Sequence, residues 1–171
     1  MLLLPVVRRT WSRRGQTPVL RHVDGRRKKV SVIAALCVSP DRREVRLYFR
    51  LLVDANFNAV AVRGFLGQLA RHFRQPLLLI WDRAKIHGGL QTQVLLDVLE
   101  WRQFYFPPYA PELNPVEYIW SYLKTNPLAN LACPEVAALA AAGRRHTRSL
   151  QYQPRLLRSF IRHSPLSLRL C

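Results

Sequence analysis

Residues 107–120 read Pro-Pro-Tyr-Ala-Pro-Glu-Leu-Asn-Pro-Val-Glu-Tyr-Ile-Trp, and this stretch predicts where a helix begins. Asn114 is a favoured capping residue, and Pro115 suits the first helical position because the N–H it lacks has no partner there in any helix. The prolines before them fix several φ angles and stiffen the approach. We therefore predict a rigid loop leading into a helix whose first turn carries Glu117, where the positive helix end favours an ionised carboxylate.

Glu117 has two interpretations. Asn114 and Glu117 have the spacing of a capping box, in which the third helical residue bonds back to the cap and has a purely structural role. An ionised carboxylate is also the ligand that a hard metal ion prefers. The residues alone leave both interpretations open.

A second candidate site residue lies upstream. Residues 77–81 (LLLIW) form an apolar run long enough only for a buried strand, and Asp82 follows it directly. Ligands of open α/β sheets gather outside the carboxyl ends of the strands, which favours a functional Asp82. A loop aspartate that begins the turn before Gly88 is an equally good interpretation. His87, taken alone, is more typical of a surface or capping histidine than of a ligand.

The rest of the pattern predicts a layered α/β sheet, with two antiparallel strands followed by alternating helices and short strands. Val30–Val38 is apolar on both faces, as in an inner strand, and residues 44–53 alternate as a half-buried edge strand does. A further strand is expected at 103–106. Apolar stripes predict two helices, one from Val62 to Phe73 and one through Leu90, Val94, Val98 and Trp101. Start and stop signals predict three more helices, at Pro115–Leu123, at Pro134–Ala142, where Gly143 ends the helix, and at Pro154–Arg162.

Charge is concentrated at the two ends of the chain. The 171 residues suit one domain, and a 49% hydrophobic share allows a real core, which excludes a wholly disordered basic tail. The net charge is +17; residues 1–29 contribute +8 and residues 144–171 contribute +7, so basic arms flank a nearly neutral body. We expect these arms to contact nucleic-acid phosphates, although any single arginine is more typical of a solvated surface.

Cysteine usage and hydropathy predict a cytoplasmic protein. Cys37, Cys133 and Cys171 fit neither a close-spaced metal site nor an even disulfide framework, which favours a reducing compartment. The apolar residues 1–7 precede the arginines, whereas a secretory signal begins with its positive charge. No apolar run approaches the ~18 residues of a membrane span, so we expect no membrane partner.

Two segments show a family resemblance. Residues 78–87 (LLIWDRAKIH) and 107–124 (PPYAPELNPVEYIWSYLK) resemble the second and third catalytic segments of DDE transposases from the mariner-like bacterial insertion-sequence superfamily. Thirty-four residues separate Asp82 from Glu117, as in that superfamily. Residues 9–16 (RTWSRRGQ) and 28–36 resemble the segment that these enzymes place after their first catalytic aspartate. The resemblance covers nearly the whole chain.

The resemblance implies an RNase H-like mixed sheet flanked by helices, in which three carboxylates hold two Mg²⁺ ions, with Mn²⁺ able to replace them. Such a site cleaves DNA and transfers strands during transposition. Asp82 and Glu117 match the second and third carboxylates. Arg83, Lys85 and Lys124 lie near them and are candidates to steer the DNA backbone, although each is more typically solvated. The implied partners are transposon-end and target DNA, at the bacterial nucleoid.

The first catalytic aspartate of the family has no counterpart in the sequence. It ends the central strand shortly before the Arg-Thr-Trp segment, and no acidic residue precedes Arg9. Asp54 follows a strand, but that amphipathic strand belongs at the sheet edge. Asp24 and Asp41 lie beside Gly and Pro and read as turn residues. Pro5 argues against residues 1–7 replacing the strand.

We therefore expect residues 1–143 to form a truncated catalytic domain that lacks its first, central strand, and residues 144–171 to form a basic helical segment. Unpaired strand edges predict poor stability and inactivity of the chain alone. A second copy or a missing N-terminal half from a neighbouring reading frame is an expected partner. The alternative is a non-catalytic basic DNA-binding or interaction protein on the same scaffold. A basic RNA-associated protein ranks last, because the aromatic stacking pattern of RNA-binding sheets is not evident.

Overall fold

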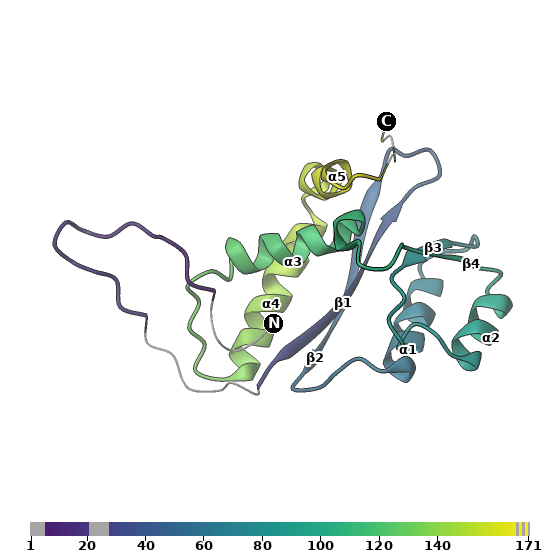
Figure 1. The fold of residues 1–171 in the computed structure, drawn as a ribbon, viewed down its shortest axis with the longest axis horizontal. Helices are drawn as coiled ribbons and strands as arrows, with labels where there is room; N and C mark the ends of the chain where they lie inside the picture. The colour runs from purple at the N-terminus through teal and green to yellow at the C-terminus, as the bar shows by residue number, and fades with distance from the viewer. Residues whose placement is uncertain (1–5, 21–27, 167, 169, 171) are drawn as a thin grey trace.

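The computed structural model describes residues 6–20, 28–166, 168 and 170. It has the mixed α/β pattern that the sequence predicts (Figure 1). The elements in chain order are β1 (Val30–Val38), β2 (Val45–Val53), α1 (Ala59–Ala70), β3 (Leu78–Trp81), α2 (Leu90–Val98), β4 (Arg102–Tyr105), the 3-10 turn η1 (Pro111–Leu113), α3 (Pro115–Thr125), α4 (Val136–Gln151) and α5 (Pro154–His163).

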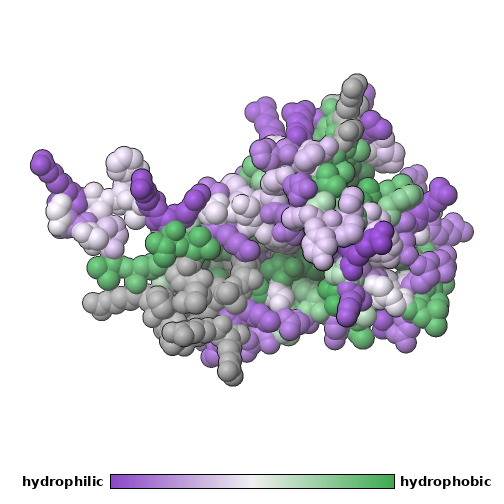
Figure 2. All heavy atoms as spheres, viewed as in Figure 1, coloured by the Kyte–Doolittle hydropathy of each residue, from purple (hydrophilic) through white to green (hydrophobic). Residues whose placement is uncertain are grey.

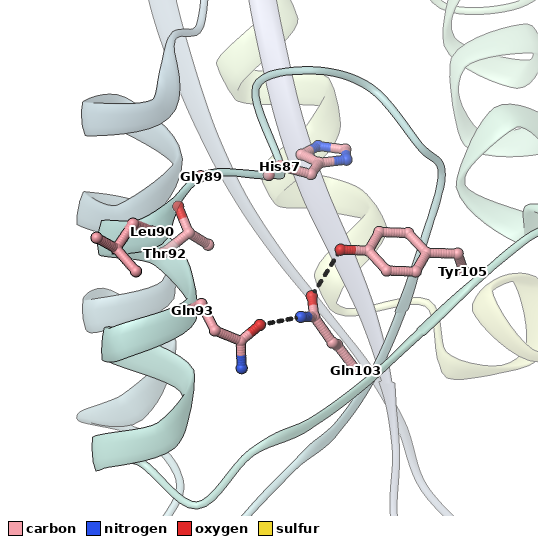
Figure 3. A pocket seen from close by; sticks show the side chains of 8 residues that line it. His87, Gly89, Leu90, Thr92, Gln93, Gln103 and Tyr105 are labelled. Carbon is pink, nitrogen blue, oxygen red and sulfur yellow. Dashed lines mark hydrogen bonds between the residues drawn. The ribbon is translucent and has the colours of Figure 1, made fainter.

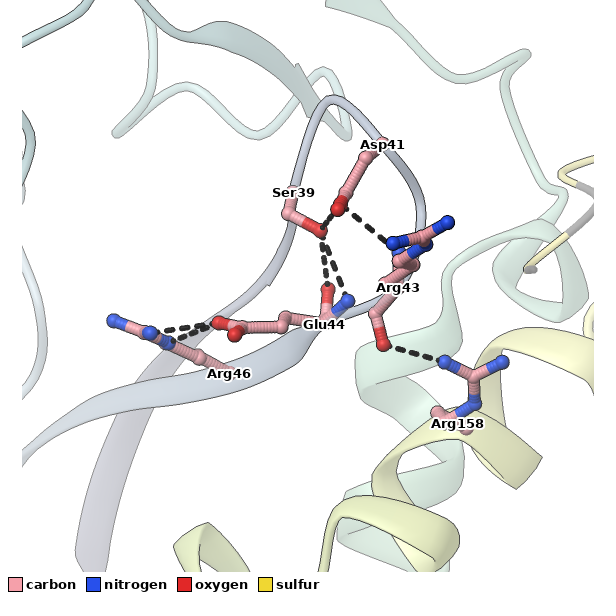
Figure 4. A network of polar contacts seen from close by, with 6 residues as sticks. All are labelled: Ser39, Asp41, Arg43, Glu44, Arg46 and Arg158. Atoms are coloured by element: carbon pink, nitrogen blue, oxygen red, sulfur yellow. Dashed lines mark hydrogen bonds and ion pairs between the residues drawn. The ribbon is translucent and has the colours of Figure 1, made fainter.

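β1 and β2 form a long antiparallel hairpin, with Val30 opposite Val53 and Val38 opposite Val45. The turn is held by Asp41, whose Oδ1 accepts from the Ser39 hydroxyl at 2.5 Å and from the Arg43 N–H at 3.1 Å (Figure 4). Asp41 is therefore a turn residue, as predicted, whereas Asp24 lies outside the described residues.

One face of the hairpin is covered by the C-terminal helices. Val45 and Leu47 of β2 are buried against apolar side chains of α3, α4 and α5, which confirms the predicted alternation at the start of the strand, whereas Val53 at its end is 45% exposed. The Arg158 guanidinium of α5 also donates to the Arg43 carbonyl at 2.6 Å and ties that helix to the turn. The helical side chains of this cluster are Ile119, Leu123, Ala142, Leu150, Leu157, Phe160 and Ile161.

The four strands form two separate sheets. β3 and β4 pair in parallel, and no strand within the described residues joins β1 to β3. β1 therefore has one paired edge, and not the two expected of an inner strand. α1 links the sheets, because its buried side chains contact Ile33 and Tyr48 of the hairpin as well as Leu79 and Trp81 of β3.

β3 is less buried than predicted. Leu79 and Trp81 belong to the α1 cluster, but Leu78 and Ile80 are 59% and 47% exposed. The reason is that successive side chains of a strand point to opposite faces, and only one face of this sheet is covered by α1 and α2. Parallel strands are normally covered on both faces.

The apolar face predicted for α2 is wrong. Leu90, Val94 and Val98 are 81%, 52% and 76% exposed, while Thr92 and Leu96 are buried; Trp101, the fourth member of the predicted stripe, follows the helix and is buried as expected. The three exposed residues do lie on one helical face, but α2 turns the opposite side toward α1. Periodicity identified the helix, whereas packing selected the buried side.

The end predicted at Gly143 for the helix that starts near Pro134 is also wrong. α4 continues from Val136 to Gln151, and Gly143 lies buried within it. A glycine in a helix costs only about 1 kcal/mol relative to alanine, which the packing of α4 against β2 outweighs. The Thr147 hydroxyl donates to the Gly143 carbonyl at 2.7 Å. The expected boundary between residues 143 and 144 thus falls inside α4.

Among the described residues, no helix is both long and apolar enough to cross a membrane.

Candidate functional site

Asp82 is the first residue after β3 and is exposed. Its Oδ1 accepts from the Ala84 N–H at 3.0 Å, and the His87 N–H donates to the Ala84 carbonyl at 2.9 Å. Asp82 therefore does begin a turn, as the interpretation of it as a loop aspartate predicts. The same geometry fixes the carboxylate at the carboxyl end of a parallel strand, where ligands gather in α/β sheets.

Glu117 lies in the first turn of α3, as predicted. The Asn114 side chain caps the helix by accepting from the Val116 N–H at 3.1 Å. In a capping box the Asn114 N–H would bond to the Glu117 carboxylate, but this N–H donates to the Pro111 carbonyl at 3.0 Å. The loop backbone therefore satisfies the N–H that a capping box would pair with Glu117, and the purely structural interpretation of Glu117 loses its basis.

The charges of three side chains meet at this position. Partial burial raises the pKa of the Glu117 carboxyl, and the negative charge of Asp82 raises it further, while the positive charge of Lys124 lowers it. The Asp82 charge is the smallest of these three influences on the Glu117 pKa, and it disfavours the ionisation of both carboxyls together. A divalent cation between two oxygen ligands would remove this repulsion, so the residues present fit a hard metal ion.

A prediction follows for the titration of Glu117. Lys124→Met is expected to raise the Glu117 pKa further, and Asp82→Asn to lower it, because each removes one of the two charges that act on the carboxyl. The pKa values are read from the Glu117 side-chain carbon signal by NMR without divalent ions. Identical titration curves in the three proteins would contradict the electrostatic contact.

The raised pKa of Glu117 also predicts how the stability of the fold changes with pH. A carboxyl whose pKa is raised by folding binds protons more tightly in the folded state, so it stabilises the fold in acid. This contribution is lost as pH rises from the ordinary value of 4.5 through the raised pKa.

The basic residues predicted near the carboxylates are all exposed. The Arg83 guanidinium lies 5.8 Å from the centre of the Tyr105 ring, within cation–π range. Lys124 is the member of this group whose charge acts on Glu117. Lys85 lies in the loop after Asp82.

His87 is neither a surface residue nor a cap, which corrects the sequence-based interpretation. Its side chain is 14% exposed, and Nδ1 lies 2.8 Å from Oδ1 of Asp82. The N-cap of α2 is Gly89, and no side chain caps that helix. The ring stacks on Trp81, which also stacks on Tyr105. The five-residue spacing after a strand-ending aspartate was the available signal, but only the fold brings the two side chains together.

A pocket of about 310 Å³ opens next to this loop, at the start of α2 (Figure 3). His87 forms part of its lining. Across it, the Tyr105 hydroxyl donates to Gln103, whose amide donates to Gln93 at 2.5 Å. Neither Asp82 nor Glu117 lines the pocket, so it is separate from the carboxylate pair.

Within the described part of the chain, no three His, Cys, Asp or Glu side chains come together as a metal-binding group. Asp54 therefore does not complete a triad with Asp82 and Glu117. It follows β2 directly, and its N–H donates to the Lys29 carbonyl at 2.8 Å.

In their described parts, both basic arms expose most of their charged side chains, but the C-terminal arm is part of the packed fold, because α4 and α5 bury Leu150, Leu157 and Ile161 in the core. Residues 6–20 extend away from the body as a loop, held by two hydrogen bonds between the Asn130 side chain and the Arg8 backbone, at 2.8 and 3.0 Å. Trp11 in this loop is fully exposed. Figure 2 shows strongly hydrophilic side chains along this loop and over α5. The exposed arginines of the C-terminal arm are Arg144, Arg145, Arg148, Arg155 and Arg162.

Comparison with known proteins identifies a family and a fold. The family model of the DDE superfamily endonuclease matches residues 3–140. Among solved structures, the Mos1 mariner paired end complex with Mn matches with a TM-score of 0.63 and 17% identity, covering 93% of this chain and 49% of that chain. The Mos1 strand transfer complex matches with a TM-score of 0.58 and 19% identity, over 98% and 53% of the two chains.

The catalytic domain of the Mos1 mariner transposase matches with a TM-score of 0.55 and 17% identity, over 80% of this chain and 76% of that domain. The fold is therefore similar to that RNase H-like catalytic domain. The chain spans about half the length of the two Mos1 chains in the DNA complexes. Comparison with curated proteins gave no match.

Proposed function

The chain belongs to the DDE superfamily endonuclease family, and we propose that it is a transposase catalytic-domain polypeptide in which Asp82 and Glu117 hold divalent cations against a DNA phosphate. The observation that carries the proposal is the placement of Asp82 at the carboxyl end of β3 and of Glu117 in the first turn of α3, near enough for the Asp82 charge to raise the pKa of the Glu117 carboxyl. They belong to the two segments whose residues resemble the family's second and third catalytic segments.

The residues of the proposed site have distinct tasks. Asp82 and Glu117 supply oxygen ligands to Mg²⁺ or Mn²⁺, and Lys124 offsets part of their negative charge. When bound, such ions stabilise the attacking and leaving oxygens of phosphodiester cleavage and strand transfer. Arg83 and Lys85 are exposed beside Asp82 and bind the sugar–phosphate backbone through charge.

We propose further that this chain alone is inactive, because its third carboxylate has to come from a strand between β1 and β3. In support, no strand of the described residues joins these two, and Leu78 and Ile80 of β3 remain exposed. A second copy of the chain or the product of a neighbouring reading frame would supply the strand.

The proposed substrate is DNA, both transposon ends and target, and the proposed location is the cytoplasm, with the bacterial nucleoid. The basic arms support this choice, because each phosphate neutralised by a basic side chain releases counterions. We propose residues 1–143 as the catalytic unit and residues 144–171 as a basic segment that is distinguished by its charge and not by its fold, because α4 runs across the boundary. The absence of a three-residue metal group among the described residues favours one alternative, a non-catalytic DNA-binding protein.

Metal binding tests the proposal. Mn²⁺ binding to the intact chain, measured by the EPR signal of the free ion, is expected to weaken at least about tenfold in Asp82→Asn and in Glu117→Gln, because each removes an ionised ligand. Asp54→Asn is the matched control and should bind Mn²⁺ as the wild type does. DNA affinity is measured in parallel and should not fall in any of the three variants.

A nicking assay on supercoiled DNA completes the test. The chain alone is expected to give no cleavage with Mg²⁺ or Mn²⁺. Cleavage that either carboxylate substitution abolishes would contradict the proposed inactivity and support the proposed site. Mn²⁺ binding that is insensitive to both substitutions would refute the site and leave the DNA-binding alternative.

A further inference from the structure

The loop that joins β3 to α2 holds a histidine whose role the carboxylate pair does not explain. The ring of His87 lies parallel to the Trp81 indole, with centroids 4.5 Å apart and an interplanar angle of 2°. Trp81 is buried in the α1 cluster. Stacking on a buried, fixed indole holds the plane of the histidine ring.

The surroundings of the ring set its tautomer. Nδ1 lies 2.8 Å from Oδ1 of Asp82 and 3.2 Å from the Asp82 carbonyl oxygen. Both of these oxygens are acceptors, so Nδ1 carries a hydrogen and donates it toward Asp82. The contact requires no charge on the imidazole.

A backbone donor of the same loop also contacts Oδ1 of Asp82. The Ala84 N–H reaches it at 3.0 Å. Oδ1 therefore accepts one hydrogen bond, from Ala84, and is also in close contact with Nδ1 of His87, whose own hydrogen bond goes to the Asp82 carbonyl oxygen. Within the described residues Oδ2 makes no hydrogen bond or ion pair, so its lone pairs are left for a cation.

We propose that His87 is a positioning residue for Asp82: through its contacts with the Asp82 carbonyl and with Oδ1, and together with the Ala84 amide, it holds the carboxylate so that Oδ2 faces a divalent cation. This inference rests on the proposed function, because it assigns the oxygen with which Asp82 acts in that site. A carboxylate already held in one orientation loses little rotational freedom on binding. Removing such an outer hydrogen-bond partner of a ligand lowers metal affinity by about 10- to 100-fold in known sites.

Two substitutions separate the hydrogen-bond donor from the stacked ring. His87→Asn keeps an N–H donor at the position of Nδ1 but loses the ring, whereas His87→Phe keeps a ring and loses the donor. Mn²⁺ binding to the intact chain is expected to weaken about tenfold in His87→Phe and to stay within about twofold of the wild type in His87→Asn. Thermal unfolding without metal should show the opposite order, with His87→Asn the less stable variant.

The outcomes are distinguishable from those of the proposed function. Mn²⁺ affinity that follows thermal stability, or that is unchanged in His87→Phe, would overturn the role of His87. Unchanged Mn²⁺ binding in Asp82→Asn would instead overturn the site itself. If His87→Phe does not fold, binding in the folded His87→Asn variant decides: retention within twofold supports the proposal, and a tenfold loss refutes it.

Discussion

Joining an apolar strand that ends in aspartate to the front of this chain is expected to produce metal-dependent DNA nicking where the chain alone gives none. The strand would pair with β1 and β3, which no strand of the described residues joins. Its terminal carboxylate would complete the site of Asp82 and Glu117. Metal ions supply several kcal/mol of transition-state stabilisation, so we expect the rate to rise at least about 10³-fold.

The experiment uses a designed extension of about six residues, the usual length of a strand. The matched control is the same extension ending in asparagine, which pairs in the same way without supplying a ligand. Both versions should unfold at higher urea concentration than the chain alone, because each ladder hydrogen bond contributes about 0.5–1.5 kcal/mol. Only the aspartate version should nick supercoiled DNA. Equal nicking by both versions, or no gain in stability from either, would contradict the prediction.

The second large effect concerns the core between the two sheets. Leu96→Ala is expected to lower the free energy of unfolding by about 2–5 kcal/mol, because Leu96 is fully buried in the cluster that links α1, α2 and β3. Because the free energy of unfolding of a typical domain is only about 5–15 kcal/mol, such a loss unfolds a large fraction of the protein. Urea unfolding followed by circular dichroism measures it.

Leu90→Ala provides the matched control, because it removes the same side chain from the same helix at an exposed position. Its effect should stay within about 0.5 kcal/mol. A larger loss from Leu90→Ala than from Leu96→Ala would mean that α2 turns its other face to the core, as the sequence pattern had predicted.

Sequence patterns located most elements of the fold where local chemistry decides them. The strands of the hairpin and the helices α1, α3 and α5 lie within a few residues of their predicted positions. The start of α3 was predictable because Asn114 and Pro115 act through their own backbone geometry, as the cap at Val116 confirms. Gly143 misled the prediction, since a weak local preference gave way to packing against β2.

The positions of the candidate site residues were also predictable from local sequence, whereas their roles were not. The strand-ending position of Asp82 and the first-turn position of Glu117 follow from neighbours in sequence. The role of Glu117 did not follow, because a capping box has the same spacing as a metal ligand. Only the fold shows that the Asn114 N–H donates to Pro111, and that the Asp82 charge acts on Glu117.

By itself, the sequence determined the basic arms, the family resemblance and the short-range geometry of the loops around Asp82 and Glu117, because these depend on residues a few positions apart. The tertiary structure alone decided which face of α2 is buried, that the sheet is divided between β1 and β3, and that His87 stacks on Trp81 and donates to Asp82. The physical reason is that burial, strand pairing and charge interactions depend on distance in space, and folding sets these distances for segments far apart in the chain.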